Sequence, residues 1–136
     1  MQVDPRSTRF SAAITTLILA LVLLTGNAWL LLAQGVVFAL GVAGVSPYGS
    51  VFRRLVRPRL GPPAQMEDAA PPRFAQGVGL VFALAGVIGF TAQITPLALG
   101  ATAAALLAAF LNAAFGFCLG CEMYLIVRRL MPAATR

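Results

Sequence analysis

The first uncharged stretch of the chain runs from Phe10 to Val45 and reads FSAAITTLILALVLLTGNAWLLLAQGVVFALGVAGV. A bilayer core about 30 Å thick needs roughly 20 apolar helical residues, so this stretch is too long for one span. Turn-forming residues lie near its middle, at Thr25-Gly26-Asn27. The stretch therefore predicts a tight hairpin of two transmembrane helices, Phe10–Leu24 and Ala28–Val45.

The second half of the chain has the same kind of pattern, divided by a proline. Two uncharged stretches, Phe74–Gln93 and Leu97–Cys121, are separated by the dipeptide Thr95-Pro96. Proline lacks a backbone N–H and fixes φ, so it ends one helix and begins the next. We expect a second hairpin with spans at Phe74–Thr91 and at Leu97 to about Val127.

The composition agrees with an integral membrane protein. Of the 136 residues, 60% are hydrophobic and 10% are charged, whereas soluble domains are about one quarter charged. We predict an all-α, transmembrane four-helix bundle made of two tandem helical hairpins, forming a single domain over residues 1–136. The first hairpin covers about 10–45 and the second about 74–127. We expect the proline-rich linker at 46–73 to have little core of its own, and it is too short to be a catalytic domain.

The basic residues predict the orientation of this bundle. All ten are arginines; they flank the hairpins or lie in the linker, and the hairpin tips carry no charge. Basic residues beside spans stay in the cytoplasm, so we expect both termini and the linker to be cytoplasmic, in a bacterial inner membrane. A cleavable signal peptide is the alternative for the first span. We expect anionic lipid headgroups, and not nucleic acid, to contact the linker arginines Arg53, Arg54, Arg57 and Arg59.

A faint internal repeat relates the two halves. Arg9-Phe10 before the first hairpin corresponds to Arg73-Phe74 before the second. After the hairpins, Arg53-Arg54-Leu55 corresponds to Arg128-Arg129-Leu130. Each half crosses twice, so we expect two copies of the same orientation, related by an axis along the membrane normal. The alternative is that arginine and aromatic residues recur only because they suit any membrane interface.

Two cysteines supply the one recognisable chemical motif, since the chain has no other cysteine and no histidine. Cys118 and Cys121 are three residues apart, a spacing that brings side chains about 5 to 6 Å apart on a helix and suits a disulfide. Cys-x-x-Cys is typical of redox dithiols, in which one thiolate attacks and the other resolves the mixed disulfide. Aligning the two Arg-Arg-Leu segments places Ala43 opposite Cys118 and Ser46 opposite Cys121.

The position of the pair predicts its chemistry. Counting 1.5 Å per residue from either end of the last span places both thiols in the inner leaflet or at its surface. The bacterial cytosol is reducing, so we expect a resting dithiol. Cys121 lies nearer the boundary, and we expect it to be the exposed nucleophile. Gly116 and Gly120 would allow another helix to approach closely or would loosen the turns near the pair.

Glu122 joins Cys118 and Cys121 as the third candidate catalytic residue. It adjoins Cys121 and is the acidic residue closest to a predicted span, where it would exchange a proton with a thiol or pair with Arg128 or Arg129. Two other interpretations of the cysteines stay open. In the first, the cysteines are simply small residues that pack between helices. In the second, they bind a metal; because zinc takes four ligands, a second chain would have to complete the site.

Five segments in order resemble the bacterial membrane family catalogued as domain of unknown function 4395 (DUF4395). The resemblance covers almost the whole chain, and its most specific part is the pattern Asn-Ala-x-Phe-Gly-x-Cys-x-Gly-Cys. It implies a small integral membrane protein of actinobacteria and related high-GC groups, loosely associated with thiol redox and sulfurtransferase functions. The segments are Val3–Arg6, Pro47–Gly49, Arg57–Pro62, Glu67–Gln76 and Leu111–Cys121.

The sequence thus predicts an inner-membrane dithiol protein. It would carry out thiol–disulfide exchange or sulfur transfer with a thioredoxin-like or sulfurtransferase partner, and no cofactor is expected. The alternative is a non-enzymatic packing or scaffold subunit of a larger complex or a homo-oligomer. We expect Gln34 and Asn112, polar residues inside predicted spans, to hydrogen-bond between helices.

Overall fold

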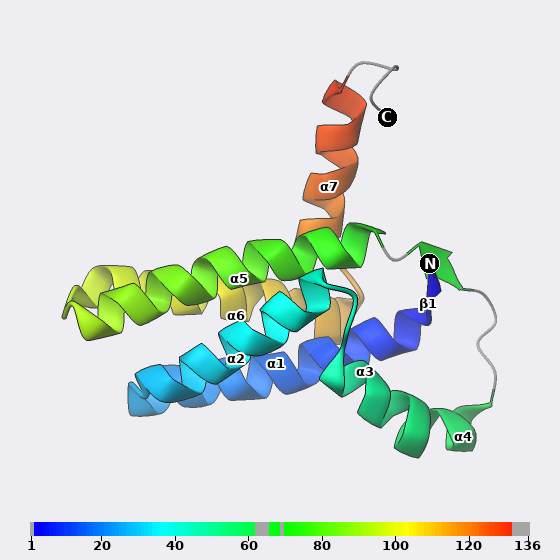
Figure 1. Cartoon of the computed structure of the whole chain (residues 1–136), viewed down its shortest axis with the longest axis horizontal. Helices are drawn as coiled ribbons and strands as arrows, with labels where there is room; N and C mark the ends of the chain where they lie inside the picture. The colour runs from blue at the N-terminus through cyan, green and yellow to red at the C-terminus, as the bar shows by residue number, and fades with distance from the viewer. Residues whose placement is uncertain (1, 62–65, 69, 132–136) are drawn as a thin grey trace.

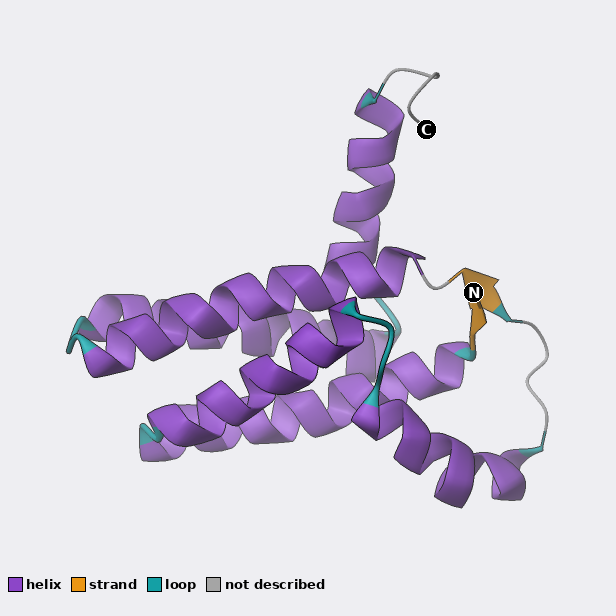
Figure 2. Cartoon of the chain, in the orientation of Figure 1, coloured by secondary structure: helices purple, strands orange, loops and turns teal. Residues whose placement is uncertain are grey.

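Four long helices lie side by side in the computed structural model of the chain, which describes residues 2–61, 66–68 and 70–131 (Figure 1). Short elements gather at one end of these helices, where the chain also begins (Figure 2). The long helices are α1 (Pro5–Thr25), α2 (Ala28–Val42), α5 (Ala70–Thr91) and α6 (Thr95–Phe115). The short elements are β1 (Gln2–Val3), α3 (Pro47–Val51), the π-helix η1 (Phe52–Val56), α4 (Arg57–Leu60), β2 (Glu67–Asp68) and α7 (Leu119–Leu130).

The turns of both hairpins form where the sequence predicts them. Gly26 ends α1 in the left-handed conformation, with φ of 66°, which costs glycine little. Asn27 then caps α2, since its side-chain oxygen accepts hydrogen bonds from the backbone N–H groups of Trp29 and Leu30. In the second half, Pro96 lies in the first turn of α6, where no N–H partner is needed.

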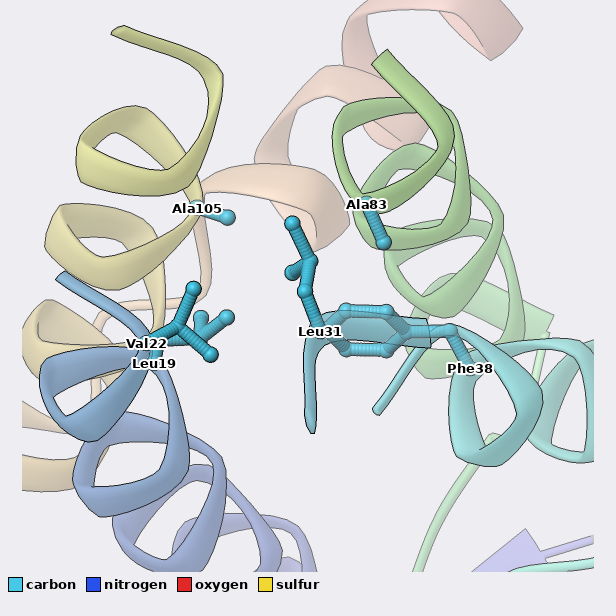
Figure 3. Close-up of a cluster of buried hydrophobic side chains, with 6 residues drawn as sticks. All are labelled: Leu19, Val22, Leu31, Phe38, Ala83 and Ala105. Atoms are coloured by element: carbon cyan, nitrogen blue, oxygen red, sulfur yellow. The ribbon is translucent and has the colours of Figure 1, made fainter. Parts of the chain in front are cut away.

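Side chains from all four long helices form the core. Helix α1 packs mainly against α6, and α2 packs mainly against α5, so the two hairpins interlock. Small residues bring α5 and α6 together: a Cβ built on Gly89 would lie 2.5 Å from the backbone nitrogen of Ala98, closer than atoms can pack. Figure 3 shows the buried cluster, which consists of Leu19, Val22, Leu31, Phe38, Ala83 and Ala105.

The outward faces of these helices are apolar, as a bilayer requires. Helices α1, α5 and α6 are each long and apolar enough to cross a membrane, and α2 with the segment Pro47–Leu60, bent by 78°, makes a fourth candidate. Leu24 and Trp29 are 83% and 79% exposed. Exposed apolar side chains of this kind are favourable in contact with lipid and unfavourable in contact with water. The chain is therefore a multi-pass membrane protein. Both hairpin tips lie at one end, and α3, α4, α7 and the N-terminus lie at the other (Figure 1).

Contacts at the second of these ends occur in matched pairs, one from each half. Nε and Nη2 of Arg73 donate to the carbonyl of Val42, the last residue of α2, at 3.0 and 2.7 Å. Nη2 of Arg9 donates to the carbonyls of Ala113 and Ala114, in the last turn of α6, at 3.3 and 3.4 Å. Each arginine, near the start of one hairpin, therefore binds the end of the other.

Matched aromatic pairs also recur, here within each half and not between the halves. The ring centroids of Phe10 and Phe52 are 5.6 Å apart with the planes at 50°, and those of Phe74 and Tyr124 are 5.6 Å apart with the planes at 49°. Strands β1 and β2, which precede α1 and α5, pair with each other in antiparallel fashion, as a two-fold axis between the halves would require. These contacts show that the two halves are arranged alike, as the internal repeat predicts; the axis along the membrane normal stays a prediction.

The predicted register of the repeat is wrong. Ser46 caps α3 by accepting the N–H of Gly49 at 3.0 Å, and Cys118 caps α7 by accepting the N–H of Cys121 at 3.1 Å. Ser46 therefore corresponds to Cys118, and not to Cys121. The Arg-Arg-Leu segments misled the alignment, because they begin seven residues after the cap in one half and ten after it in the other. A difference of three is close to one helical turn and leaves arginines on a similar face.

Two further expectations need correction. The last span was expected to be one helix from Leu97 to about Val127, but the structure has two helices, and α6 ends at Phe115 before α7 begins at Leu119. The linker was expected to have little core of its own, but Phe52 within it is only 2% exposed. Phe52 packs against Phe10, and the guanidinium of Arg6 lies 5.9 Å from the centre of its ring.

Candidate functional site

The site begins with the end of α6. Gly116 follows the helix with φ of 68°, and its N–H donates to the carbonyl of Asn112 at 3.0 Å. The N–H of Phe117 donates to the carbonyl of Leu111 at 3.2 Å. This pair of bonds is the usual way in which a helix ends at a glycine, because it satisfies carbonyls that lack helical partners. The chain therefore turns away just before the first cysteine.

Cys118 occupies the N-cap position of α7. It has extended backbone angles, φ of −92° and ψ of 104°, and its sulfur accepts the backbone N–H of Cys121 at 3.1 Å. The Cα atoms of the two cysteines are 5.1 Å apart, and a disulfide joins their sulfurs. The expected resting dithiol stays a prediction. The spacing prediction is confirmed: the two sulfurs can bond to each other.

A close contact holds the first turn of α7 on α5. A Cβ built on Gly120 would lie 2.5 Å from the Cβ of Ala75 and 2.6 Å from its Cα, so only glycine fits between the cysteines at this contact. One turn further along α7, Tyr124 packs against Phe74 of α5. The expected close approach at Gly120 is confirmed, and it fixes the cysteine pair relative to α5.

A cation from the first hairpin lies beside the α6–α7 break. Besides its bonds to the end of α6, Arg9 has Nε, Cδ and Cζ within 3.8 to 3.9 Å of a Cβ built on Gly116. Gly116 is two residues before Cys118. The guanidinium is thus brought next to the cysteine segment from more than 100 residues away in the chain. Sequence reasoning missed this role and gave Arg9 only a topological one.

Glu122 lies in the first turn of α7, next to Cys121, and its side chain is exposed. A carboxylate there is favoured by the partial positive charge of a helix N-terminus. Arg128, suggested as an ion-pair partner for Glu122, instead places its guanidinium 5.8 Å from the ring centre of Tyr124 and donates to its hydroxyl at 3.4 Å. The proton-transfer role of Glu122 stays a prediction.

Metal ligands are sparse around the pair. Within residues 2–61, 66–68 and 70–131, no three side chains of His, Cys, Asp or Glu cluster closely enough to hold an ion. A metal at the cysteines would therefore need ligands from a second molecule. Of the linker arginines expected to meet lipid headgroups, Arg53, Arg54 and Arg59 are exposed, so that binding also stays a prediction.

The chain has long apolar helices, and a Cys-x-x-Cys pair lies at the start of the short helix α7. Together these features define a multi-pass membrane protein with two neighbouring cysteines. More particularly, the chain belongs to the family described as domain of unknown function (DUF4395), whose model matches residues 3–129. The resemblance found in the sequence is thereby confirmed. Neither the curated proteins nor the solved structures provided a significant match.

Proposed function

We propose that the protein exchanges electrons with a dithiol or disulfide partner protein, through Cys118 and Cys121, at the surface of the membrane. One observation carries the proposal: the sulfur of Cys118 is the N-cap of α7 and already accepts the N–H of Cys121. Backbone N–H groups and the helix dipole stabilise an anionic sulfur at such a position. This favours Cys118 as the attacking thiolate, in place of Cys121, with Cys121 as the resolving thiol.

The exchange balances without a cofactor. The Cys118 thiolate attacks one sulfur of a partner disulfide, so a new S–S bond forms while the partner's second sulfur leaves as a thiolate. Cys121, deprotonated, then attacks the sulfur of Cys118 and releases the partner's first sulfur. The partner gains two electrons and ends as a dithiol, and the Cys118–Cys121 pair loses two electrons and ends as a disulfide. The reverse steps oxidise a partner dithiol.

Access to the pair supports an exchange with a protein partner. Both cysteines are half-buried, neither sealed in the core nor fully exposed. Helix α7 leaves the bundle sideways, across the direction of α5 and α6, and most of its length points away from the long helices (Figure 1). The arginines of the described residues gather at this same end, so by the positive-inside rule we expect it in the cytoplasm, beside anionic headgroups. A thioredoxin-like protein is the kind of partner that this location would allow.

Mixed-disulfide trapping tests the proposal. With Cys121→Ser, attack by Cys118 leaves a partner or a small disulfide probe covalently bound, because no thiol resolves it. With Cys118→Ser, we expect much less adduct at the same pH. Non-reducing gels and intact mass of the purified chain, treated with oxidised glutathione, give the readout. Equal adduct from both variants would refute the assignment of Cys118, and absence of adduct from both would refute thiol exchange.

The competing scaffold function is tested with the double variant. Cys118→Ser with Cys121→Ser should insert into the membrane normally but fail to complement any redox-dependent phenotype of the deletion strain. Full complementation by this variant would favour a packing subunit. A membrane-impermeant maleimide, applied to intact cells and to lysed cells after reduction, checks the location: labelling only after lysis is expected, and labelling of intact cells would overturn the cytoplasmic placement.

A further inference from the structure

Arg9 joins the first hairpin to the cysteine segment of the second. Its Nη2 atom donates to the carbonyls of Ala113 and Ala114 at 3.3 and 3.4 Å. The last carbonyls of a helix have no partners within the helix, so bonds from a side chain stabilise the point at which the helix ends. Arg9 therefore supports the end of α6 from outside, while Gly116 supports it through its left-handed backbone.

The charge of this side chain also bears on the thiols. A cation is favoured at a helix C-terminus, where the peptide dipoles leave partial negative charge. The same guanidinium lies against Gly116, two residues before Cys118, and a nearby arginine stabilises a cysteine thiolate. The end of the membrane-spanning region has a lower dielectric constant than water, which strengthens both effects.

We propose that Arg9 is a positioning residue for the thiol chemistry. It holds the break between α6 and α7, so that Cys118 stays at the N-cap of α7, and it supplies a fixed positive charge to the segment in which the Cys118 thiolate forms. This inference rests on the proposed function. It adds that the first hairpin, which has no cysteine, controls the reactivity of the pair in the second.

The internal repeat offers a matched control. Arg73 makes the equivalent contact in the other half, donating to the carbonyl of Val42 at 3.0 and 2.7 Å. The N-cap that follows Val42 is Ser46, so no thiol depends on this contact. Replacing Arg73 removes the same kind of bond from the same end of the bundle. It therefore reports any general effect of losing a cap of this type.

The experiment compares Arg9→Gln, Arg9→Lys and Arg73→Gln with the wild-type chain, full length and purified in lipid nanodiscs. After reduction, alkylation of Cys118 by iodoacetamide is followed by peptide mass spectrometry from pH 5 to pH 10. We expect Arg9→Gln to slow alkylation at neutral pH about three- to tenfold, and to move its midpoint to higher pH. Arg9→Lys keeps the positive charge but loses the planar, multi-donor guanidinium, so its alkylation rate should lie between those of the wild type and Arg9→Gln. Arg73→Gln should match the wild type.

Two results would overturn the role of Arg9: an unchanged pH profile in Arg9→Gln, or an equal shift in Arg73→Gln. If Arg9→Gln does not fold, Arg9→Lys gives the decision: an unchanged pH profile in Arg9→Lys overturns the role of Arg9, and so does a shift in Arg73→Gln as large as the one in Arg9→Lys. The proposed function fails differently. In that case the reduced wild-type pair itself would not react with oxidised glutathione, whatever residue stands at position 9.

Discussion

Gly120 provides the sharpest test of how the site is held, because its contact with Ala75 leaves no room for a side chain. In Gly120→Ala, the new Cβ would lie 2.5 Å from the Cβ of Ala75 and 2.6 Å from its Cα. Carbon atoms pack at about 3.5 to 4.0 Å, so α7 and α5 must separate by roughly 1 Å. Alanine has the better helix propensity, by up to about 1 kcal/mol, and this offsets part of the cost of overpacking, about 1 to 3 kcal/mol.

The net expectation for Gly120→Ala is a loss of about 1 to 2 kcal/mol in the docking of α7 on α5. A loss of 1.4 kcal/mol makes detachment of α7 about tenfold more frequent. The assay is hydrogen–deuterium exchange of α7 amides in lipid nanodiscs, together with the alkylation rate of the reduced cysteines. We expect faster exchange across Leu119–Leu130. We expect little change in α1 or α2, because the main packing partners of α7 are α5 and α6.

Gly100→Ala is the matched control for this prediction. Gly100 lies in α6, and a Cβ built on it meets nothing within 4 Å, so alanine there should be neutral or stabilising by up to about 1 kcal/mol. Ala75→Gly in the Gly120→Ala chain removes the nearer of the two clashing atoms and should restore part of the docking, as a double-mutant cycle would measure. Wild-type exchange and alkylation in Gly120→Ala would refute the packing argument, as would a rescue of zero.

Two more predictions concern the first half of the chain. Gln34 is 1% exposed, accepts the Tyr48 hydroxyl at 2.8 Å and donates to Thr15 at 3.4 Å, so Gln34→Leu should destabilise the fold by about 1 to 3 kcal/mol, measured by thermal unfolding in detergent. Tyr48→Phe is its milder control, and an unchanged melting temperature in both variants would contradict the network. Asp4 caps α1, and its hydrogen bond from Arg6 holds the pKa of that carboxyl below its usual value. The ionised Asp4 carboxylate therefore stabilises the fold fully at pH values above the usual pKa of an aspartate, and this stabilisation is lost as the pH falls through the lowered pKa. Asp4→Asn should flatten this part of the profile of melting temperature against pH. An unflattened profile would show that other groups cause the loss of stability at low pH.

The apolar pattern was sufficient to predict the helices and their pairing into hairpins. Backbone groups in lipid must bond within their own helix, so long apolar stretches have one main solution, and the breaks must occur at residues such as Gly26, Asn27 and Pro96. Gln34 was also predictable as a bond between helices, since a polar side chain inside a span needs a partner. The cysteine spacing belongs to this category, because it depends on residues close together in the sequence.

The tertiary structure alone decided where the last apolar stretch breaks and which residues surround the cysteines. Apolar residues continue through Phe115, Phe117 and Leu119, so hydropathy does not register the turn that Gly116 makes between α6 and α7. Arg9 reaches this turn from the other hairpin because α1 packs against α6, a pairing that no local pattern specifies. Local sequence determines where a chain can be helical, whereas the environment of a thiol depends on which distant helices pack beside it.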